Sequence, residues 1–97
     1  MALSLSQWFQ PLDPYMQSVL ELQGDRDRGR AIFSMNCAVC HGADGTGYVG
    51  PSLVGVSNRK SQVALIEQVI SGKTPPMPQF QPAPRDMADL LCYLETL

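Results

Sequence analysis

Residues 37–41 read Cys37-Ala38-Val39-Cys40-His41, and this C-x-x-C-H stretch is the most informative part of the chain. Its spacing is the attachment signature of a c-type haem. Two thiols three positions apart can add to the two vinyl groups of one porphyrin. The histidine that follows can then ligate the iron through an imidazole nitrogen. The motif therefore predicts one haem, held covalently by Cys37 and Cys40, with His41 as an axial ligand.

A C-x-x-C pair can also be a thioredoxin-like redox motif, but that motif is usually found beside a βαβ pattern. No such pattern is visible in this chain, and the adjacent His41 favours haem. The third cysteine, Cys92, lies in the apolar stretch Leu90-Leu91-Cys92-Tyr93-Leu94. We expect it to be a small buried residue rather than a reactive thiol.

Length and composition indicate one small globular domain. The chain has 97 residues, of which 44% are hydrophobic and 16% charged, and these fractions argue against disorder. A domain of this size buries a limited core, to which a covalent haem would add. The formal net charge is -2 and no basic run is present, which argues against nucleic-acid binding.

The spacing of apolar residues predicts an all-α fold. Helices are expected over about 25–36, over 61–71 between Ser61 and Gly72, and from 84 or 85 to 97. Their apolar stripes are Gly29, Ile32 and Phe33 in the first, Val63, Ile66, Val69 and Ile70 in the second, and Met87, Leu90, Leu91 and Leu94 in the third. No strand pattern is visible. Residues 42–58, with five glycines, and 74–84, with five prolines, are expected to be irregular.

The chain is expected to divide into an N-terminal extension, residues 1–23, and a haem domain, residues 24–97. Within the extension, Asp13-Pro14-Tyr15 predicts the start of a short helix whose apolar face is Tyr15, Val19 and Leu22. No run of about 20 apolar residues is present, and the first residues do not have the pattern of a signal peptide. We interpret the extension as the remnant of a membrane tether or as sequence added to the natural chain.

The second axial ligand is predicted to be Met77. His41 is the only histidine, so a methionine is the remaining usual choice. Met77 lies in Thr74-Pro75-Pro76-Met77-Pro78, where prolines on both sides hold the backbone extended and present the thioether. The other four methionines are less suitable: Met1 is terminal, Met16 lies in the extension, Met35 is too close to Cys37, and Met87 belongs to an apolar stripe.

With these features in this order, residues 24–97 resemble the class I cytochromes c. The resemblance rests on Gly29-x-x-x-Phe33, on the haem motif, on Gly50-Pro51-x-Leu53 and on Met77-Pro78 before a terminal helix. It implies a fold of three to five helices wrapped around the haem. It also implies that the first and last helices cross at Gly29, with Phe33 packed against Tyr93.

In that family the carbonyl of the proline, here Pro51, accepts a hydrogen bond from the free nitrogen of the axial histidine, which raises the basicity of the ring. Arg59 is a further candidate, for contact with a haem propionate, although a solvated surface charge explains it equally well. A closer resemblance is to the cytochrome M family of cyanobacteria. It rests on Asp13-Pro14-Tyr15, on the stretch from Val69 to Pro78 and on the ending Met87-Ala88-Asp89-Leu90-Leu91.

The resemblance implies a one-electron carrier, not an enzyme, in a photosynthetic or respiratory chain. The expected partners are redox proteins, such as a terminal oxidase or a small soluble carrier. The expected location is the exported side of an energy-transducing membrane, in the thylakoid lumen or the periplasm. The native form would be a monomer tethered by an N-terminal helix that this chain lacks.

The alternative function is a haem-based sensor or a peroxidase-like enzyme with an open sixth site. It requires that Met77 does not ligate the iron. No second histidine and no obvious catalytic acid lies near the motifs, which disfavours it. A haem domain released from a larger complex is a third interpretation.

Overall fold

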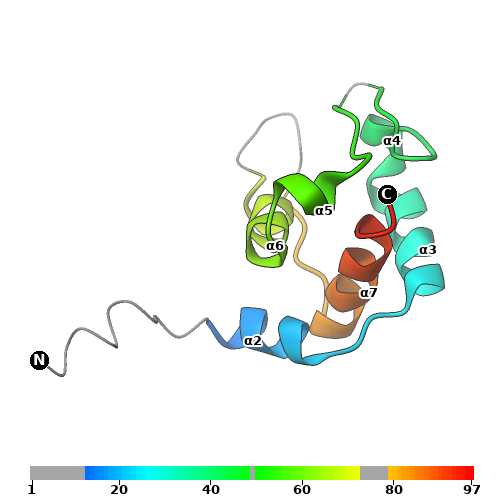
Figure 1. Cartoon of the computed structure of the whole chain (residues 1–97). Helices are drawn as coiled ribbons and strands as arrows, with labels where there is room; N and C mark the ends of the chain where they lie inside the picture. The colour runs from blue at the N-terminus through cyan, green and yellow to red at the C-terminus, as the bar shows by residue number, and fades with distance from the viewer. Residues whose placement is uncertain (1–12, 49, 73–78) are drawn as a thin grey trace, which may run out of the picture.

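The computed structural model describes residues 13–48, 50–72 and 79–97, and the regular structure in these ranges is helical. The helices are α2 (Pro14–Glu21), α3 (Arg26–Asn36), α4 (Ala38–His41), α5 (Val56–Arg59), α6 (Gln62–Ser71) and α7 (Pro84–Leu94). Figure 1 shows α7 beside α3, with α6 on the other side of α7 and α2 across the lower end. The predicted all-α class is confirmed.

Side-chain caps explain where three of the helices begin. In each case an oxygen of the residue before the helix accepts the backbone N–H three positions later. The pairs are Asp13 with Met16 at 2.9 Å, Asp25 with Arg28 at 3.0 Å and Ser61 with Ala64 at 3.1 Å. Helix α6 ends at Gly72, whose φ of 56° lies in the left-handed region that favours glycine. The predicted limits of α3 and α6 are confirmed to within one residue.

Helices α3 and α7 cross at Gly29. A Cβ at this position would overlap the backbone of Asp89 and lie 2.9 Å from the Cβ of Tyr93, so only glycine allows this approach. One turn further along α3, the rings of Phe33 and Tyr93 pack with centroids 5.3 Å apart and planes tilted by 53°. The crossing that the resemblance implies is therefore present.

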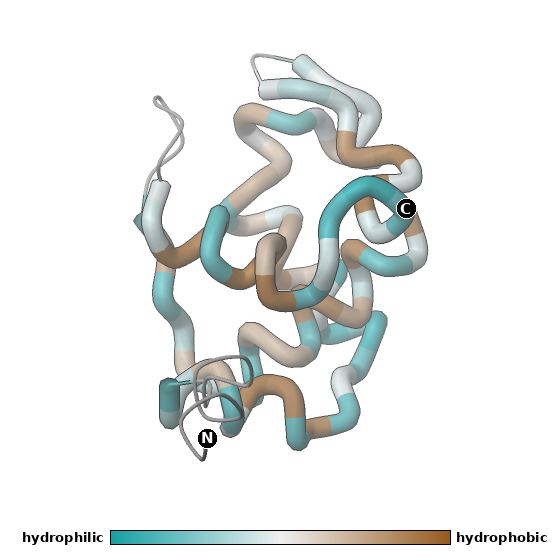
Figure 2. Tube along the Cα trace, turned by 60° about the vertical axis from the view of Figure 1, so that its left-hand side comes forward, coloured by the Kyte–Doolittle hydropathy of each residue, from teal (hydrophilic) through white to brown (hydrophobic). Residues whose placement is uncertain are grey.

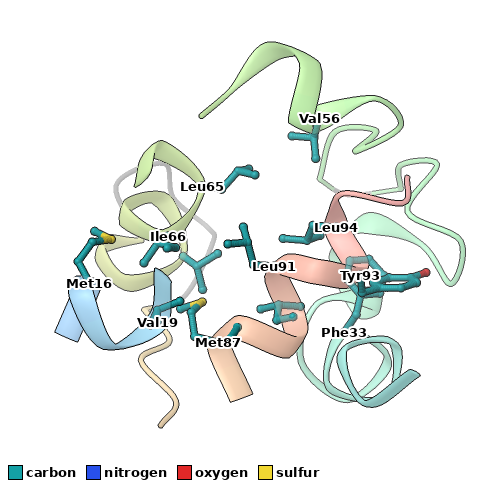
Figure 3. Packing of buried hydrophobic residues seen from close by; sticks show 13 residues of the cluster. Met16, Val19, Phe33, Val56, Leu65, Ile66, Met87, Leu91, Tyr93 and Leu94 are labelled. Atoms are coloured by element: carbon teal, nitrogen blue, oxygen red, sulfur yellow. The ribbon is translucent and has the colours of Figure 1, made fainter. Parts of the chain in front are cut away.

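The core is formed where α2, α3, α5, α6 and α7 meet (Figure 3). Its buried hydrophobic residues are Met16, Val19, Phe33, Val56, Leu65, Ile66, Val69, Met87, Ala88, Leu90, Leu91, Tyr93 and Leu94. Along the helices, hydrophobic segments alternate with hydrophilic ones (Figure 2), as expected when one face of each helix is buried. All four residues of the stripe predicted for the last helix are in the core.

Helix α2 belongs to this packed body, although the sequence places it in an extension. Met16 is 4% exposed and Val19 is 1% exposed. Figure 3 shows Val19 beside Met87 of α7 and Met16 beside Ile66 of α6. The prediction that Leu22 shares the apolar face is wrong. The helix ends at Glu21, and Leu22 turns away as its C-cap, where it is exposed. Met16 occupies the core instead.

Three local details differ from the sequence predictions. The irregular stretch 42–58 leads into one helical turn, α5, which follows the left-handed Gly55. The last helix ends at Leu94, three residues before the end of the predicted range. Cys92 is half-buried rather than fully buried, beside Gly24. In the described ranges, no helix has the length and apolar character needed to span a bilayer.

Candidate functional site

The Cys37–His41 motif forms a tight turn at the end of α3. The N–H of Cys37 donates to the carbonyl of Phe33 at 2.7 Å, which completes α3. The carbonyl of Cys37 then accepts the N–H of Cys40 at 3.1 Å and that of His41 at 3.0 Å, so the next four residues make the single turn α4. Residues three apart lie on the same side of a helical turn, which places both cysteines on one side.

The His41 ring is buried, and its orientation is fixed by Pro51. Nδ1 of His41 lies 2.8 Å from the carbonyl oxygen of Pro51, and the residue is 9% exposed. A carbonyl oxygen can only accept, so Nδ1 must carry the proton in this contact. In the neutral ring this contact leaves the lone pair on Nε2, which is the tautomer that a metal ligand requires.

The loop that carries Pro51 is fastened to the haem motif by backbone hydrogen bonds. Gly50 N–H donates to the carbonyl of Cys40 at 2.5 Å, and Gly47 N–H donates to that of His41 at 2.7 Å. Gly50 has a further requirement: a Cβ there would lie 2.8 Å from Cε1 and 2.9 Å from Nδ1 of His41. Only a glycine therefore lets the loop close over the edge of the imidazole ring.

The two motif cysteines are half-buried. Burial, and to a smaller extent the neighbouring Cys40, raises the pKa of the Cys37 thiol to about 11. A thiol whose pKa is raised in this way forms little thiolate at neutral pH, so it binds metals poorly and is a weak nucleophile. It is available for addition of S–H across a vinyl group.

Arg59, at the end of α5, holds the same loop from the outside. Its Nη1 donates to the carbonyl of Val54 at 2.7 Å, and its Nη2 donates to that of Ser52 at 3.4 Å. The sequence suggested a propionate contact for Arg59 and did not indicate these backbone contacts. The signal that could have found them is the short separation between Arg59 and the glycine-rich loop.

Met77 lies outside the described residues, as does Lys73. The described residues after this segment are attached to α6 and α2. Phe80 N–H donates to the carbonyl of Val69 at 3.0 Å, and the hydroxyl of Tyr15 donates to the carbonyl of Pro82 at 2.6 Å. The site that the structure describes therefore brings together Cys37, Cys40, His41 and Pro51. It adds Gly50, whose close contact with the His41 ring the sequence did not indicate.

Comparisons with known proteins agree on one family. Residues 24–94 match the family model described as cytochrome c oxidase, cbb3-type, subunit III. A protein named cytochrome c-553-like from Synechocystis sp. is 65% identical over 89 residues, which are 92% of this chain and 85% of that protein. The crystal structure of cytochrome cL from Hyphomicrobium denitrificans matches with a TM-score of 0.62 at 25% identity. That match covers 91% of this chain and 55% of the cytochrome cL chain, so this chain spans about half its length.

The chain belongs to the cytochrome c family, and its helical fold is that of a class I cytochrome c. Its cofactor is a covalently bound haem c, and its role is that of a haem-based electron carrier. The local structure fits this group. Two cysteines lie on one side of a helical turn, and a buried imidazole has one nitrogen bonded to a carbonyl and the other left to ligate iron.

Proposed function

We propose that the protein is a one-electron carrier in which Cys37 and Cys40 hold the haem and His41 and Met77 are its axial ligands. The hydrogen bond of His41 to Pro51 is the observation that best supports this proposal, since it selects the tautomer of a ligand. Met77 is proposed on the sequence alone, because of the prolines around it. Haem supplies an iron that cycles between the ferric and ferrous states.

In electron transfer, the role of the protein is to keep the ligands of the iron in place when the iron changes between the ferric and ferrous states. Pro51 holds the imidazole through Nδ1, and Gly47 and Gly50 bond the backbone carbonyls of His41 and Cys40. With both axial positions filled by side chains, substrate has no access to the iron, which is why we propose electron transfer rather than enzymatic catalysis. The sequence suggests a propionate contact for Arg59, but the contacts of its guanidinium in the structure are with the carbonyls of Val54 and Ser52.

The proposed partners are redox proteins, either a terminal oxidase or a small soluble carrier, in a photosynthetic or respiratory chain. The cyanobacterial relative supports a location on the exported side of a membrane, in the thylakoid lumen or the periplasm. We propose that the native form is a monomer, tethered through a segment before the haem domain. We propose residues 24–97 as the haem domain, because the family match begins at residue 24, with α2 of the preceding segment packed against it.

Two measurements on the purified haem protein test the proposal: a redox titration followed by optical spectra, and carbon monoxide binding to the ferrous protein. We expect one reversible one-electron step and a ferrous protein that does not bind carbon monoxide at neutral pH. Rapid binding would mean that the sixth position is open, and would favour a sensor or a peroxidase-like enzyme. The denatured protein should retain its haem, and retention should be lost when both Cys37 and Cys40 are replaced by alanine.

A further inference from the structure

We propose that Arg59 is a positioning residue for the axial histidine. Its guanidinium holds the loop in which Pro51 lies, so that the Pro51 carbonyl stays in contact with Nδ1 of His41. The inference rests on the proposed function, because it takes His41 to be the iron ligand. It differs from a propionate contact, in which the charge of Arg59 would act directly on the haem.

The contacts of Arg59 lie directly after Pro51 in the chain. Its guanidinium bonds the carbonyl of Ser52, the next residue, and that of Val54, three residues after Pro51. Two nitrogens of one planar group therefore bridge two carbonyls. Because a guanidinium presents its donors in a rigid fork, the short bond anchors the carbonyl of Val54 and the longer contact limits the movement of the carbonyl of Ser52.

Pro51 depends on such contacts from its neighbours. It is exposed, and proline has no backbone N–H with which to anchor itself. Before it, Gly50 is tied to the carbonyl of Cys40 at 2.5 Å. After it, the N–H of Leu53 is tied to the carbonyl of Gly45 at 2.7 Å. Arg59 adds the carbonyls on the outer side of the loop, so the Pro51 carbonyl is held between two sets of bonds.

The hydrogen bond to Pro51 determines how basic the imidazole of His41 is. A stronger bond at Nδ1 pushes electron density onto Nε2, and a more basic ligand favours the ferric iron. Loosening the loop should therefore raise the reduction potential. Removing a positive charge beside a propionate should instead lower the reduction potential, because it stabilises the more positively charged ferric state. The two roles of Arg59 thus predict shifts of opposite sign.

The decisive variant is Arg59→Lys, which keeps the charge but cannot bridge two carbonyls with one planar group. We expect its reduction potential to rise, and the Nδ1 proton of His41 in NMR spectra of the reduced protein to exchange about fivefold faster. Arg59→Gln should show the same increase in proton exchange. The matched control is Arg30→Lys, which changes an exposed arginine on α3.

An unchanged or lower potential in Arg59→Lys, with unchanged proton exchange, would overturn the inference. An unchanged Arg59→Lys together with a lowered potential in Arg59→Gln would assign Arg59 to a propionate instead. Failure of the proposed function would be seen separately. In that case the unsubstituted protein would not show an iron-shifted His41 ring, whatever residue stands at position 59.

Discussion

The carboxylate of Asp89, fully buried in α7, accepts a hydrogen bond at 2.5 Å from the guanidinium of Arg28 on α3. Its other oxygen accepts the backbone N–H of Asp25 at 2.7 Å and lies 3.5 Å from Arg85. A buried charge is tolerated when it is paired and hydrogen-bonded in this way. The cluster fastens the start of α3 to α7, beside the glycine crossing.

Replacing Arg28 by alanine should therefore destabilise the protein, even though the arginine side chain itself is 55% exposed. The carboxylate of Asp89 would lose its shortest partner inside the protein and keep only Asp25 and Arg85. We expect a loss of about 2 kcal/mol in the free energy of unfolding, measured by chemical denaturation. Arg30→Ala, on the exposed face of the same helix, is the control and should change it by less than about 0.5 kcal/mol. Equal effects of the two substitutions would contradict the role of the buried pair.

Gly50→Ala should alter the haem site rather than the rest of the fold. The new Cβ would lie within 3.0 Å of two atoms of the His41 ring, so the loop or the ring must move. We expect a weaker bond to Pro51, a raised reduction potential and a destabilisation of about 2 kcal/mol. Potentiometry and thermal unfolding measure the two effects. The exposed Ser57→Ala is the control, and an alanine variant with an unchanged potential would show that the close approach is unimportant.

Met77→Ala should abolish the weak sulfur-to-iron band at the red end of the ferric spectrum, because the thioether is the proposed sixth ligand. Met87→Ala should retain the band. Met87 is 1% exposed in the core, so its truncation should cost about 3 kcal/mol of stability without changing the ligation. The opposite pattern in the two spectra would rule out Met77.

Tyr15→Phe should weaken the attachment of α2 and change how stability depends on pH. The lost bond to the carbonyl of Pro82 should cost about 1 kcal/mol at neutral pH. Burial, followed by the charge of Asp86, raises the pKa of Tyr15 above its ordinary value of 10.0. The folded chain therefore holds the phenol proton more tightly than the unfolded chain. This contribution is complete below pH 10.0 and is lost as the pH rises through the folded-state pKa.

Denaturation curves between pH 7 and 11 measure this difference. The unsubstituted protein should lose more stability above pH 10.0 than Tyr15→Phe does. Tyr48→Phe removes the hydroxyl of a tyrosine that is 80% exposed, and should behave like the unsubstituted protein. Parallel curves for all three proteins would show that Tyr15 does not contribute to the pH dependence.

Electron transfer to a redox partner should depend only weakly on ionic strength. The seven basic and nine acidic side chains are mixed along the sequence, so no run of like charge forms a strong steering patch. Stopped-flow rates with a terminal oxidase or a small soluble carrier, from low to high salt, measure this dependence. A fall of several orders of magnitude would indicate a charged docking surface, for which Arg59 and Lys60 are the first residues to test.

Most of the helical structure could be predicted because its signals are local. Asp25, Ser61 and Gly72 act on backbone groups a few residues away, and apolar spacing identifies the buried face of α7. The same reasoning missed the burial of Met16, because this side chain is covered by α6, a helix some fifty residues later in the chain.

The sequence by itself determined the cofactor and the class of protein, because haem attachment needs two thiols and a histidine within five consecutive residues. Only the tertiary structure placed Asp89 on Arg28, Tyr15 on Pro82 and Arg59 on the carbonyls beside Pro51. The Asp89–Arg28 and Tyr15–Pro82 contacts join residues more than sixty positions apart. No periodicity or spacing in the sequence indicates that these residues meet. They form because the α3–α7 crossing and the attached α2 bring distant backbone and side-chain groups together, where each buried polar group must find a partner.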